Sequence, residues 1–573
     1  MPLSPANAAH ALGDYLHSFP DDHPLHVALR TYALSLSLSL GPALVPFLIS
    51  PKARAGGIKA LTNVLRREFG ISSFASSMTV GVGGGAALKF ILDNWSKRFH
   101  RDASCSTKAT SPLPSWWQRL KTWLASLDEF HRNFVSNLIS AYMAIVLLQS
   151  RRRLSRNTPP RAAIPMTALT TSTPTSPSFT LDLTLLFVVR AIDSLVRSKL
   201  LPCETKLSSK ATREEKDRVR NKRQQVTTRL DAFVFWASSA RIMWCFFYEP
   251  DSLPRSYNKW IMSLANIDPR LLHALRAIRS DSFSYVKGFS IPPDLVSGFS
   301  RDLGYPSAWG DPALLPGYGG AEADRVWKTL GVTNRSGVGG LPCELVHSGF
   351  GSSCTANAGV RGIHAFAEAL AIYIPVHILP ILLTRPRTLL QKQQIVSSIL
   401  SILRSASFLS TFVSSIWFAI CMTRTLFLAR LFPSIPHDFW DGPFGCTFIG
   451  SLVCGSSIWV EEGKRRGEMA LYVLPRAIRA CIPKSWLTSG RRSVRVVERL
   501  AFVLSLATLL TASSQSRESL RGLSRWTLSF VMKGPNTGFW KRKRQDASTT
   551  ATLLDSSSPR ESSPPPDTQQ TKT

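Results

Sequence analysis

The sequence predicts an all-α fold: a polytopic helical membrane protein with two pseudo-repeated halves of about four to five helices each. Of its 573 residues, 44% are hydrophobic and 18% are charged. About 17 to 25 helical residues cross a hydrocarbon core of about 30 Å, and several charge-free runs fall in that range. These runs are Thr31–Ser50, Phe69–Leu88, Asn133–Ser150, Ser405–Thr423 and Phe444–Val460, and Ala365–Thr384 carries only Glu368.

Four weaker apolar runs lie between or after the strong ones. Each is shorter or contains a charge, so each is predicted to be either a span or an interfacial helix. They are Leu181–Val196, Ala232–Tyr248, Glu468–Ile482 and Ala501–Ser513.

The positive charge of the chain lies between these runs. Lys and Arg number 69 against 37 Asp and Glu, giving a net charge of +32. Loops such as 52–67, 199–229 and 464–495 are therefore expected to be solvated and to meet anionic lipid headgroups. They are poor in interleaved aromatic residues, which argues against a nucleic-acid partner. Nine cysteines are too few for a disulfide-built secreted scaffold.

Landmarks recur in the same order in the two parts of the chain. The spacing from Pro46 to Phe74 equals that from Pro380 to Phe408, and Arg190-Ala-Ile recurs as Arg476-Ala-Ile. Such order predicts two related membrane halves, an arrangement common in carriers and pores.

The predicted division of the chain follows from these patterns. A short N-terminal segment and a basic, Ser/Pro-rich disordered tail flank two membrane halves and a polar centre. The first half includes a disordered insert at 154–180 and a basic loop at 199–229. The parts are residues 1–24, the first half 25–265, the polar central region 266–359, the second half 360–532 and the tail 533–573.

The central region contains the spacing Cys-x3-His-x6-Cys, formed by Cys343, His347 and Cys354. Thiolate and imidazole are suitable zinc ligands, and His364 would make a fourth. A Cys343–Cys354 disulfide and a purely structural role are the alternatives, and the spacing does not decide among the three.

Four charged residues lie in or beside apolar runs: Arg190, Asp193, Arg241 and Arg476. A charge in hydrocarbon normally faces a polar cavity, a partner or a headgroup. Asp193 is expected to pair with Arg190 along one helix face. Glu249 and Asp251 are expected to pair with Arg241 from outside the span. The other interpretation is snorkelling of the arginines from helix ends.

Gly81 and Gly85 have the GxxxG spacing inside an apolar run. Without Cβ atoms, two helices approach closely, so a helix-packing role is predicted. A phosphate loop would need Gly-Lys-Ser/Thr, which Lys89 does not provide. The nucleophile-elbow, zinc-protease and dinucleotide-binding signatures are also missing, so the protein is expected not to be an enzyme and to need no cofactor unless zinc binds.

Three segments carry a family resemblance: Pro342-Cys343-Glu-Leu-Val-His347 with Ser353-Cys354, Tyr248–Trp260, and Arg465-Arg466 with Tyr472–Ala477. Together they resemble the amino-terminal cysteine-containing domain of the transmembrane protein 135 family, in its fungal form. Part of that family is similar to channel subunits of mitochondrial import translocases. The resemblance implies a multi-pass protein of mitochondrial or peroxisomal membranes, associated with organelle dynamics and lipid handling. It brings no catalytic residues, and this chain has few central cysteines.

The leading functional prediction is thus a non-enzymatic organelle membrane protein whose partners are membrane lipids, including anionic headgroups, and proteins of the same membrane. One alternative is a transporter or conduit with a polar site between the two halves. Another is a membrane-bound metal or redox protein that uses Cys343, His347 and Cys354.

Overall fold

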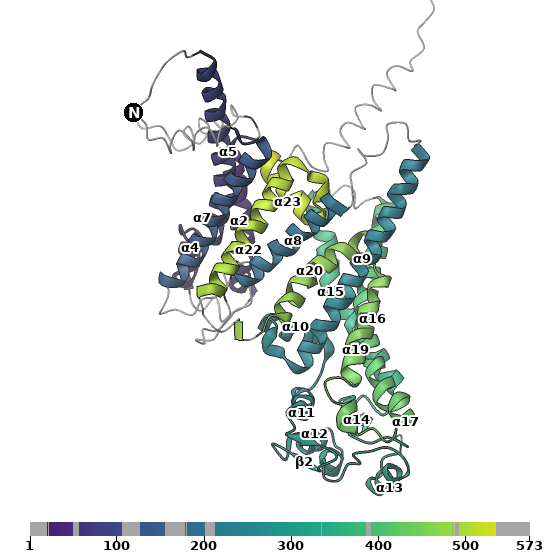
Figure 1. Ribbon diagram of the computed structural model, residues 1–573. Coiled ribbons are helices and arrows are strands. Elements are labelled where there is room, and N and C mark those ends of the chain that lie inside the picture. Colours follow the sequence, from purple (N-terminus) through teal and green to yellow (C-terminus); the bar gives the residue numbers. More distant parts are fainter. Residues whose placement is uncertain are drawn as a thin grey trace, which may run out of the picture. The chain divides into compact units, whose positions relative to one another are not determined.

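The computed structural model is helical, as the apolar runs predict (Figure 1). Among the described residues, the β structure is one two-stranded antiparallel pair, β1 (Phe283–Ser284) with β2 (Phe289–Ser290). The all-α membrane fold class is therefore confirmed, while the pseudo-repeat stays a prediction. The structure describes residues 20, 22–49, 57–105, 126–154, 178, 180–200, 213–333, 335–384, 391–483, 485–486 and 492–534.

The long helices follow the predicted runs, and short elements fill the centre. Before the centre lie α2 (Pro24–Ile49), α4 (Gly57–Glu68), α5 (Phe74–Cys105), α7 (Glu129–Leu154), α8 (Leu181–Leu200) and α9 (Arg213–Tyr248). The centre contains η2 (Pro250–Ser252), α10 (Arg255–Ala265), α11 (Pro269–Arg279), α12 (Leu295–Asp302), η3 (Ser307–Gly310), α13 (Ala321–Leu330) and α14 (Cys343–Val346). After it come α15 (Cys354–Thr384), α16 (Lys392–Cys421), the π-helix η5 (Met422–Leu426), α17 (Leu428–Leu431), α18 (His437–Trp440), α19 (Cys446–Cys454), η6 (Gly455–Val460), α20 (Gly463–Cys481), α22 (Arg492–Gln515), η7 (Arg517–Ser519) and α23 (Gly522–Lys533).

Two compact units make up the chain, one of residues 1–148 with 506–573 and one of residues 149–505. They cut across the two predicted membrane halves. Helix α9, placed by sequence in the first half, packs on α19 and α20 in the second unit. The predicted halves concern sequence repeats and the units concern packing, so the halves stay a prediction. The predicted segments 1–24, 154–180 and 533–573 lie almost wholly outside the described residues.

Glycines hold the helices of the first unit close together. A Cβ on Gly81 of α5 would lie 3.0 Å from the Cβ of Ala144 on α7. The Ser140 hydroxyl donates to the Gly81 carbonyl oxygen at 2.8 Å. A Cβ on Gly85 would lie 2.9 Å from Ser140 Oγ and closer still to Asn137 Oδ1. Gly81 and Gly85 thus face α7 at the contact between the two helices.

Substitution of Gly85 tests this contact. Gly85→Ala is expected to destabilise the chain by about 1–3 kcal/mol, because Asn137 is held by a 3.2 Å bond to Thr511 and cannot withdraw freely. Gly84→Ala is the control, since its Cβ would lie 3.6 Å from the Ser140 Cβ, an ordinary contact. Thermal unfolding in detergent measures both, and equal midpoints for the two variants would contradict the role given to Gly85.

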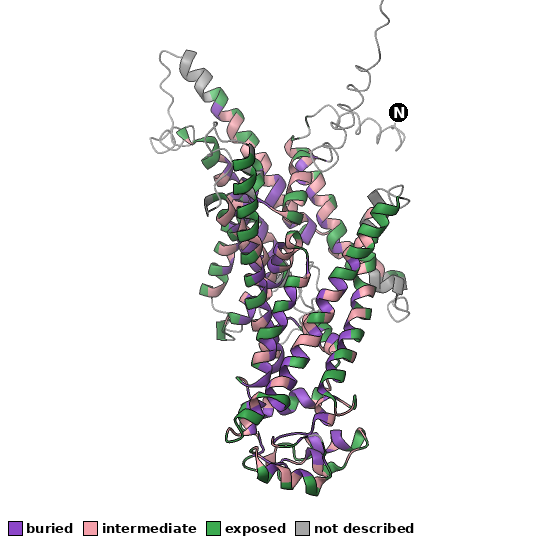
Figure 2. Cartoon of the chain, turned by 90° about the vertical axis from the view of Figure 1, so that its right-hand side faces the viewer, coloured by how far each residue is buried: buried purple, intermediate pink, exposed green. Residues whose placement is uncertain are grey.

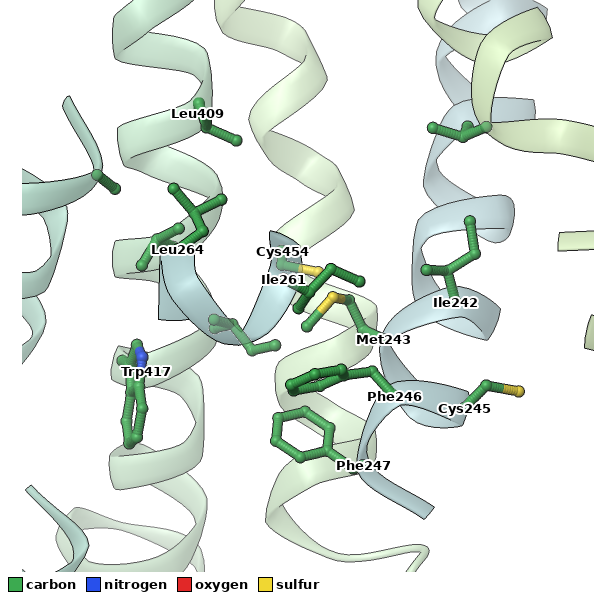
Figure 3. Packing of buried hydrophobic residues seen from close by; sticks show 14 of the residues in the cluster. Ile242, Met243, Cys245, Phe246, Phe247, Ile261, Leu264, Leu409, Trp417 and Cys454 are labelled. Atoms are coloured by element: carbon green, nitrogen blue, oxygen red, sulfur yellow. The ribbon is translucent and has the colours of Figure 1, made fainter. Parts of the chain in front are cut away.

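The second unit has the largest apolar core. Helix α9 contributes Phe246 and Phe247, which lie among side chains of α10, α16 and α19 (Figure 3). Trp417 on α16 and Cys454 on α19 belong to the same cluster. Close packing of these side chains stabilises the contact between the helices through dispersion.

The polar central region, residues 266–359, has its own small core at one end of α9, α16 and α19 (Figure 1). Trp309 and Trp327 lie in this core with Phe283, and each indole N–H donates to a backbone carbonyl oxygen, of Leu330 and Val338 respectively. This packing fixes the position of α14, whose side chains lie next to the end of α16.

Five of the described helices are long and apolar enough to cross a membrane, by length and composition. Their outward faces carry large apolar side chains, for example Phe233 at 63% exposure and Leu400 at 60%. Exposed residues run along the outer sides of the long helices, and buried ones face inward (Figure 2). Such apolar exposure is costly in water and suits lipid. The five helices are Phe74–Arg98, Glu129–Ser150, Asp217–Tyr248, Lys392–Leu431 and Arg492–Gln515.

Candidate metal centre

A tight turn brings the three predicted ligands together. Cys343 begins the four-residue helix α14, His347 follows its last residue, and Cys354 begins α15. Gly349 and Gly351 between them have φ values of 85° and 86°, in the left-handed region that glycine adopts without steric cost. The chain therefore reverses direction within a few residues. The ligand atoms of Cys343, His347 and Cys354 all lie within 4.8 Å of one another.

The histidine is held in the form that binds a metal. The Nδ1 atom of His347 lies 2.8 Å from the Gly351 carbonyl oxygen. A carbonyl only accepts, so Nδ1 carries the proton and Nε2 presents its lone pair. His347 is 0% exposed, and burial lowers its pKa below the usual value, which keeps the imidazole neutral. Metal-binding histidines are commonly oriented by a hydrogen bond of this kind.

The two cysteines are free thiols in the structure, so the disulfide alternative is not formed there. A hydrogen bond with Cys354 and burial together raise the pKa of the Cys343 thiol to about 12. A metal ion would displace such a proton, because thiolate is the binding form. The cluster is closed to water on the described side chains, with Cys343 4% and Cys354 6% exposed.

A third cysteine, which sequence reasoning did not connect with these residues, reaches the cluster from α16. Cys421 is 3% exposed and belongs to one buried group with Cys343 and Cys354. Its Sγ lies 3.5 Å from His347 Nε2. His364, the expected fourth ligand, is exposed on α15, and neither His364 nor Cys421 is among the three residues whose ligand atoms all lie within 4.8 Å of one another. The prediction for His364 is therefore wrong, because His364 is exposed and lies ten residues after Cys354 on the same helix, about 15 Å along its axis.

Buried charges lie next to the cluster. Arg424 of η5 donates from Nε to Asp441 Oδ1 at 2.6 Å and from Nη2 to Oδ2 at 3.1 Å. The Tyr285 hydroxyl donates to Asp441 Oδ2 at 2.8 Å. Burial alone would raise the pKa of Asp441, but the guanidinium of Arg424 and these hydrogen bonds hold it at about 2. The carboxylate is thus ionised at every physiological pH.

Arg335 lies between this ion pair and the cysteines. It is 1% exposed, and its Nη1 lies 3.4 Å from Cys343 Sγ. Its Nη2 donates to Nε2 of His437 at 3.1 Å, which requires a neutral imidazole, and burial lowers the pKa of His437 well below the usual value. Burial and the neighbouring Arg424 lower the pKa of Arg335 to about 10, so it remains cationic at neutral pH.

A comparison with known protein families matches the part of the chain that contains this turn. Residues 342–481 match the family model for the N-terminal cysteine-rich region of Transmembrane protein 135. This part of the chain is therefore similar to the cysteine-rich region of the transmembrane protein 135 family. Cys343, His347, Cys354 and Cys421 all lie inside the matched residues of that region. The predicted family resemblance is confirmed there, and the likeness to import-translocase channel subunits stays a prediction. The comparisons with curated proteins and with solved structures found no match.

The charges predicted within the apolar helices have other partners. Arg190 on α8 donates to Glu468 of α20 at 2.9 Å, and Asp193 pairs with Arg197 at 3.4 Å. The predicted pairing of Arg190 with Asp193 is therefore wrong, because α20 brings a carboxylate against α8.

Arg241 and Arg476, the other two arginines predicted in apolar helices, differ in their contacts. Arg241 donates to the Ala480 carbonyl oxygen at 2.8 Å and lies 3.9 Å from Glu249, one of the two acidic residues expected to pair with it. Arg476 lies over the Tyr472 ring at 4.0 Å. Neither of two cavities found in the described part of the chain is lined by Arg190, Arg241 or Arg476. The conduit alternative gains no support from these cavities.

Proposed function

We propose that the protein is a non-enzymatic, multi-pass protein of a mitochondrial or peroxisomal membrane that acts in organelle dynamics or lipid handling. The observation that carries the membrane role is the set of long helices whose exposed faces bear large apolar side chains. The family match of residues 342–481 is consistent with it. The organelle and the biological role are proposed from the family resemblance.

Anionic lipid headgroups are the partners that the charge distribution favours. An open cavity of about 470 Å³ is lined by Arg229, Arg466 and Trp459, with polar residues of α9. The Arg466 guanidinium lies 4.6 Å from the Trp459 ring centroid. Tryptophan and arginine at the end of an apolar helix are typical of the membrane interface, where arginine pairs with phosphate. Lipid contact is therefore proposed at this end of the second unit.

A structural metal ion is proposed at Cys343, His347 and Cys354. The three ligand atoms converge in a buried, closed pocket at the junction of α14 and α15. Structural zinc sites are closed, whereas catalytic zinc sites keep an open position for water. The ion would hold the polar central region in place and carry out no reaction. This assignment favours a structural centre over the redox alternative.

Organelle fractionation of the tagged full-length chain tests the membrane proposal. The protein is expected to sediment with mitochondrial or peroxisomal markers. It should remain in the membrane pellet after the alkaline carbonate wash, because alkaline pH does not extract apolar helices from lipid. Recovery in the carbonate wash would overturn the membrane role. Recovery in the pellet of a different membrane would overturn the organelle and leave the membrane role intact.

A further inference from the structure

Three predicted ligands leave one position of a tetrahedral zinc ion unfilled. We propose that Cys421 supplies it, forming a Cys3His zinc site with Cys343, His347 and Cys354, and that Arg335 balances the charge of this site. The inference rests on the structural metal ion proposed above. It adds the ligand that ties the central region to a membrane-spanning helix, since Cys421 lies within the candidate span Lys392–Leu431.

The distance to the histidine fits shared coordination. With Zn–S of about 2.3 Å and Zn–N of about 2.0–2.1 Å, tetrahedral geometry sets the S···N separation at about 3.6 Å. Cys421 Sγ lies 3.5 Å from His347 Nε2. The Nδ1 proton of His347 is engaged by Gly351, so it is the Nε2 lone pair that faces the sulfur. A neutral thiol would make only a weak hydrogen bond there.

The charge of Arg335 supports thiolates in the cluster. Its guanidinium is buried, yet none of the ion pairs found among the described residues includes it, and the nearby carboxylate of Asp441 is held by Arg424. Its contacts are neutral acceptors, among them His437, the Trp327 ring at 5.7 Å and the sulfur of Cys343. A buried cation is costly unless it is paired. Zinc with three thiolates carries a charge of −1, so the filled site supplies the missing anion.

The π-helix explains how α16 reaches the site. The Phe427 N–H donates to the Met422 carbonyl oxygen at 2.9 Å, an i→i+5 bond, directly after Cys421. Such a widened turn often marks a functional position in a helix. It places Thr425 Oγ1 3.4 Å from Cys343 Sγ and 3.2 Å from Arg335 Nη1. Cys421 and Thr425 therefore both face α14, one as a ligand and one as support.

Zinc analysis and zinc X-ray absorption on the detergent-purified full-length chain test the proposal. The wild type is expected to hold one zinc per chain with three sulfur neighbours and one nitrogen. Cys421→Ser is expected to lose at least about tenfold in zinc affinity and one sulfur from the spectrum. Cys245→Ser, a buried cysteine on α9, is the matched control and should retain the wild-type spectrum.

Arg335 is tested as a positioning residue by its charge. Arg335→Met is expected to lower zinc affinity about 10- to 100-fold, the range for residues that support metal ligands, without changing the coordination spectrum. Arg335→Lys should recover part of that loss, because it restores the positive charge. Equal affinities of the methionine variant and the wild type would overturn the charge role.

The outcomes separate this inference from the metal proposal it rests on. A wild-type spectrum with two sulfurs, or unchanged affinity and spectrum in Cys421→Ser, would overturn the fourth ligand and leave zinc at the other three. The wild-type spectrum decides this even where Cys421→Ser does not fold. A wild-type chain purified with zinc present throughout that holds no metal would overturn both.

Discussion

Cys354→Ser is expected to remove the protection of backbone amides against hydrogen exchange in the turn between α14 and α15. Structural zinc contributes apparent binding free energies of about 10–16 kcal/mol in small domains, and that binding free energy is folding free energy. In this chain the central region also has an apolar core around Trp309 and Trp327, so the loss is expected to be local. Amide exchange over residues 343–357 should accelerate at least about 100-fold, equivalent to about 2.8 kcal/mol.

Chelation of the wild type should reproduce that exchange pattern. Cys454→Ser is the matched control, because Cys454 is a buried thiol of α19 that donates to the Ser451 carbonyl oxygen and lies outside the cluster. It should leave exchange at 343–357 unchanged. Equal protection in Cys354→Ser and the wild type, with zinc bound to neither, would show that the turn needs no metal.

Asp441→Asn is expected to destabilise the second unit by about 3–5 kcal/mol. The carboxylate is the buried counter-ion of Arg424 and accepts from Tyr285, so its loss leaves an unpaired buried guanidinium. Asp302→Asn makes the same change at a surface pair with Arg270, where the Asp302 side chain is 67% exposed. That control should cost no more than about 1 kcal/mol. Thermal unfolding in detergent compares the two variants.

The effect of Asp441 also has a defined pH dependence. Its folded pKa is about 2, below the unfolded value of 3.8. A depressed pKa contributes stability that is fully present above the unfolded pKa and is lost as the pH falls through the folded one. The difference between wild type and Asp441→Asn should therefore be constant from pH 7 to about pH 5 and shrink from about pH 4 to pH 2. A difference that stays unchanged down to pH 2 would contradict the assigned pair.

Hydropathy alone predicted the long helices, because lipid-facing and core-facing residues on a membrane helix are both apolar. Helices α5, α7 and α16 follow runs read from the sequence. The three candidate metal ligands were also picked out by sequence, since they lie within twelve residues of one another in the polar centre. Both the apolar runs and the Cys/His spacing are local patterns, and local patterns can be read directly from a sequence.

Contacts between distant helices left no such signal. Cys421 lies inside an apolar run, where cysteine is an ordinary core residue, so nothing in its neighbourhood predicts its contact with His347. The partner of Arg190 is Glu468, from a helix far along the chain. Asp193, three residues from Arg190, was the expected partner because a sequence shows only the separation of residues along the chain. The buried Arg424–Asp441 pair was missed for the same reason.

The central claim is that the exposed apolar faces of the long helices lie in lipid. Single cysteines at Phe233 and Leu400, compared with one at the exposed Tyr318 of the central region, test it most directly. In intact and in opened organelle vesicles, a water-soluble maleimide should label Tyr318→Cys in at least one preparation and Phe233→Cys and Leu400→Cys in neither, measured above the unsubstituted chain. Labelling of all three at similar rates in opened vesicles would contradict the claim.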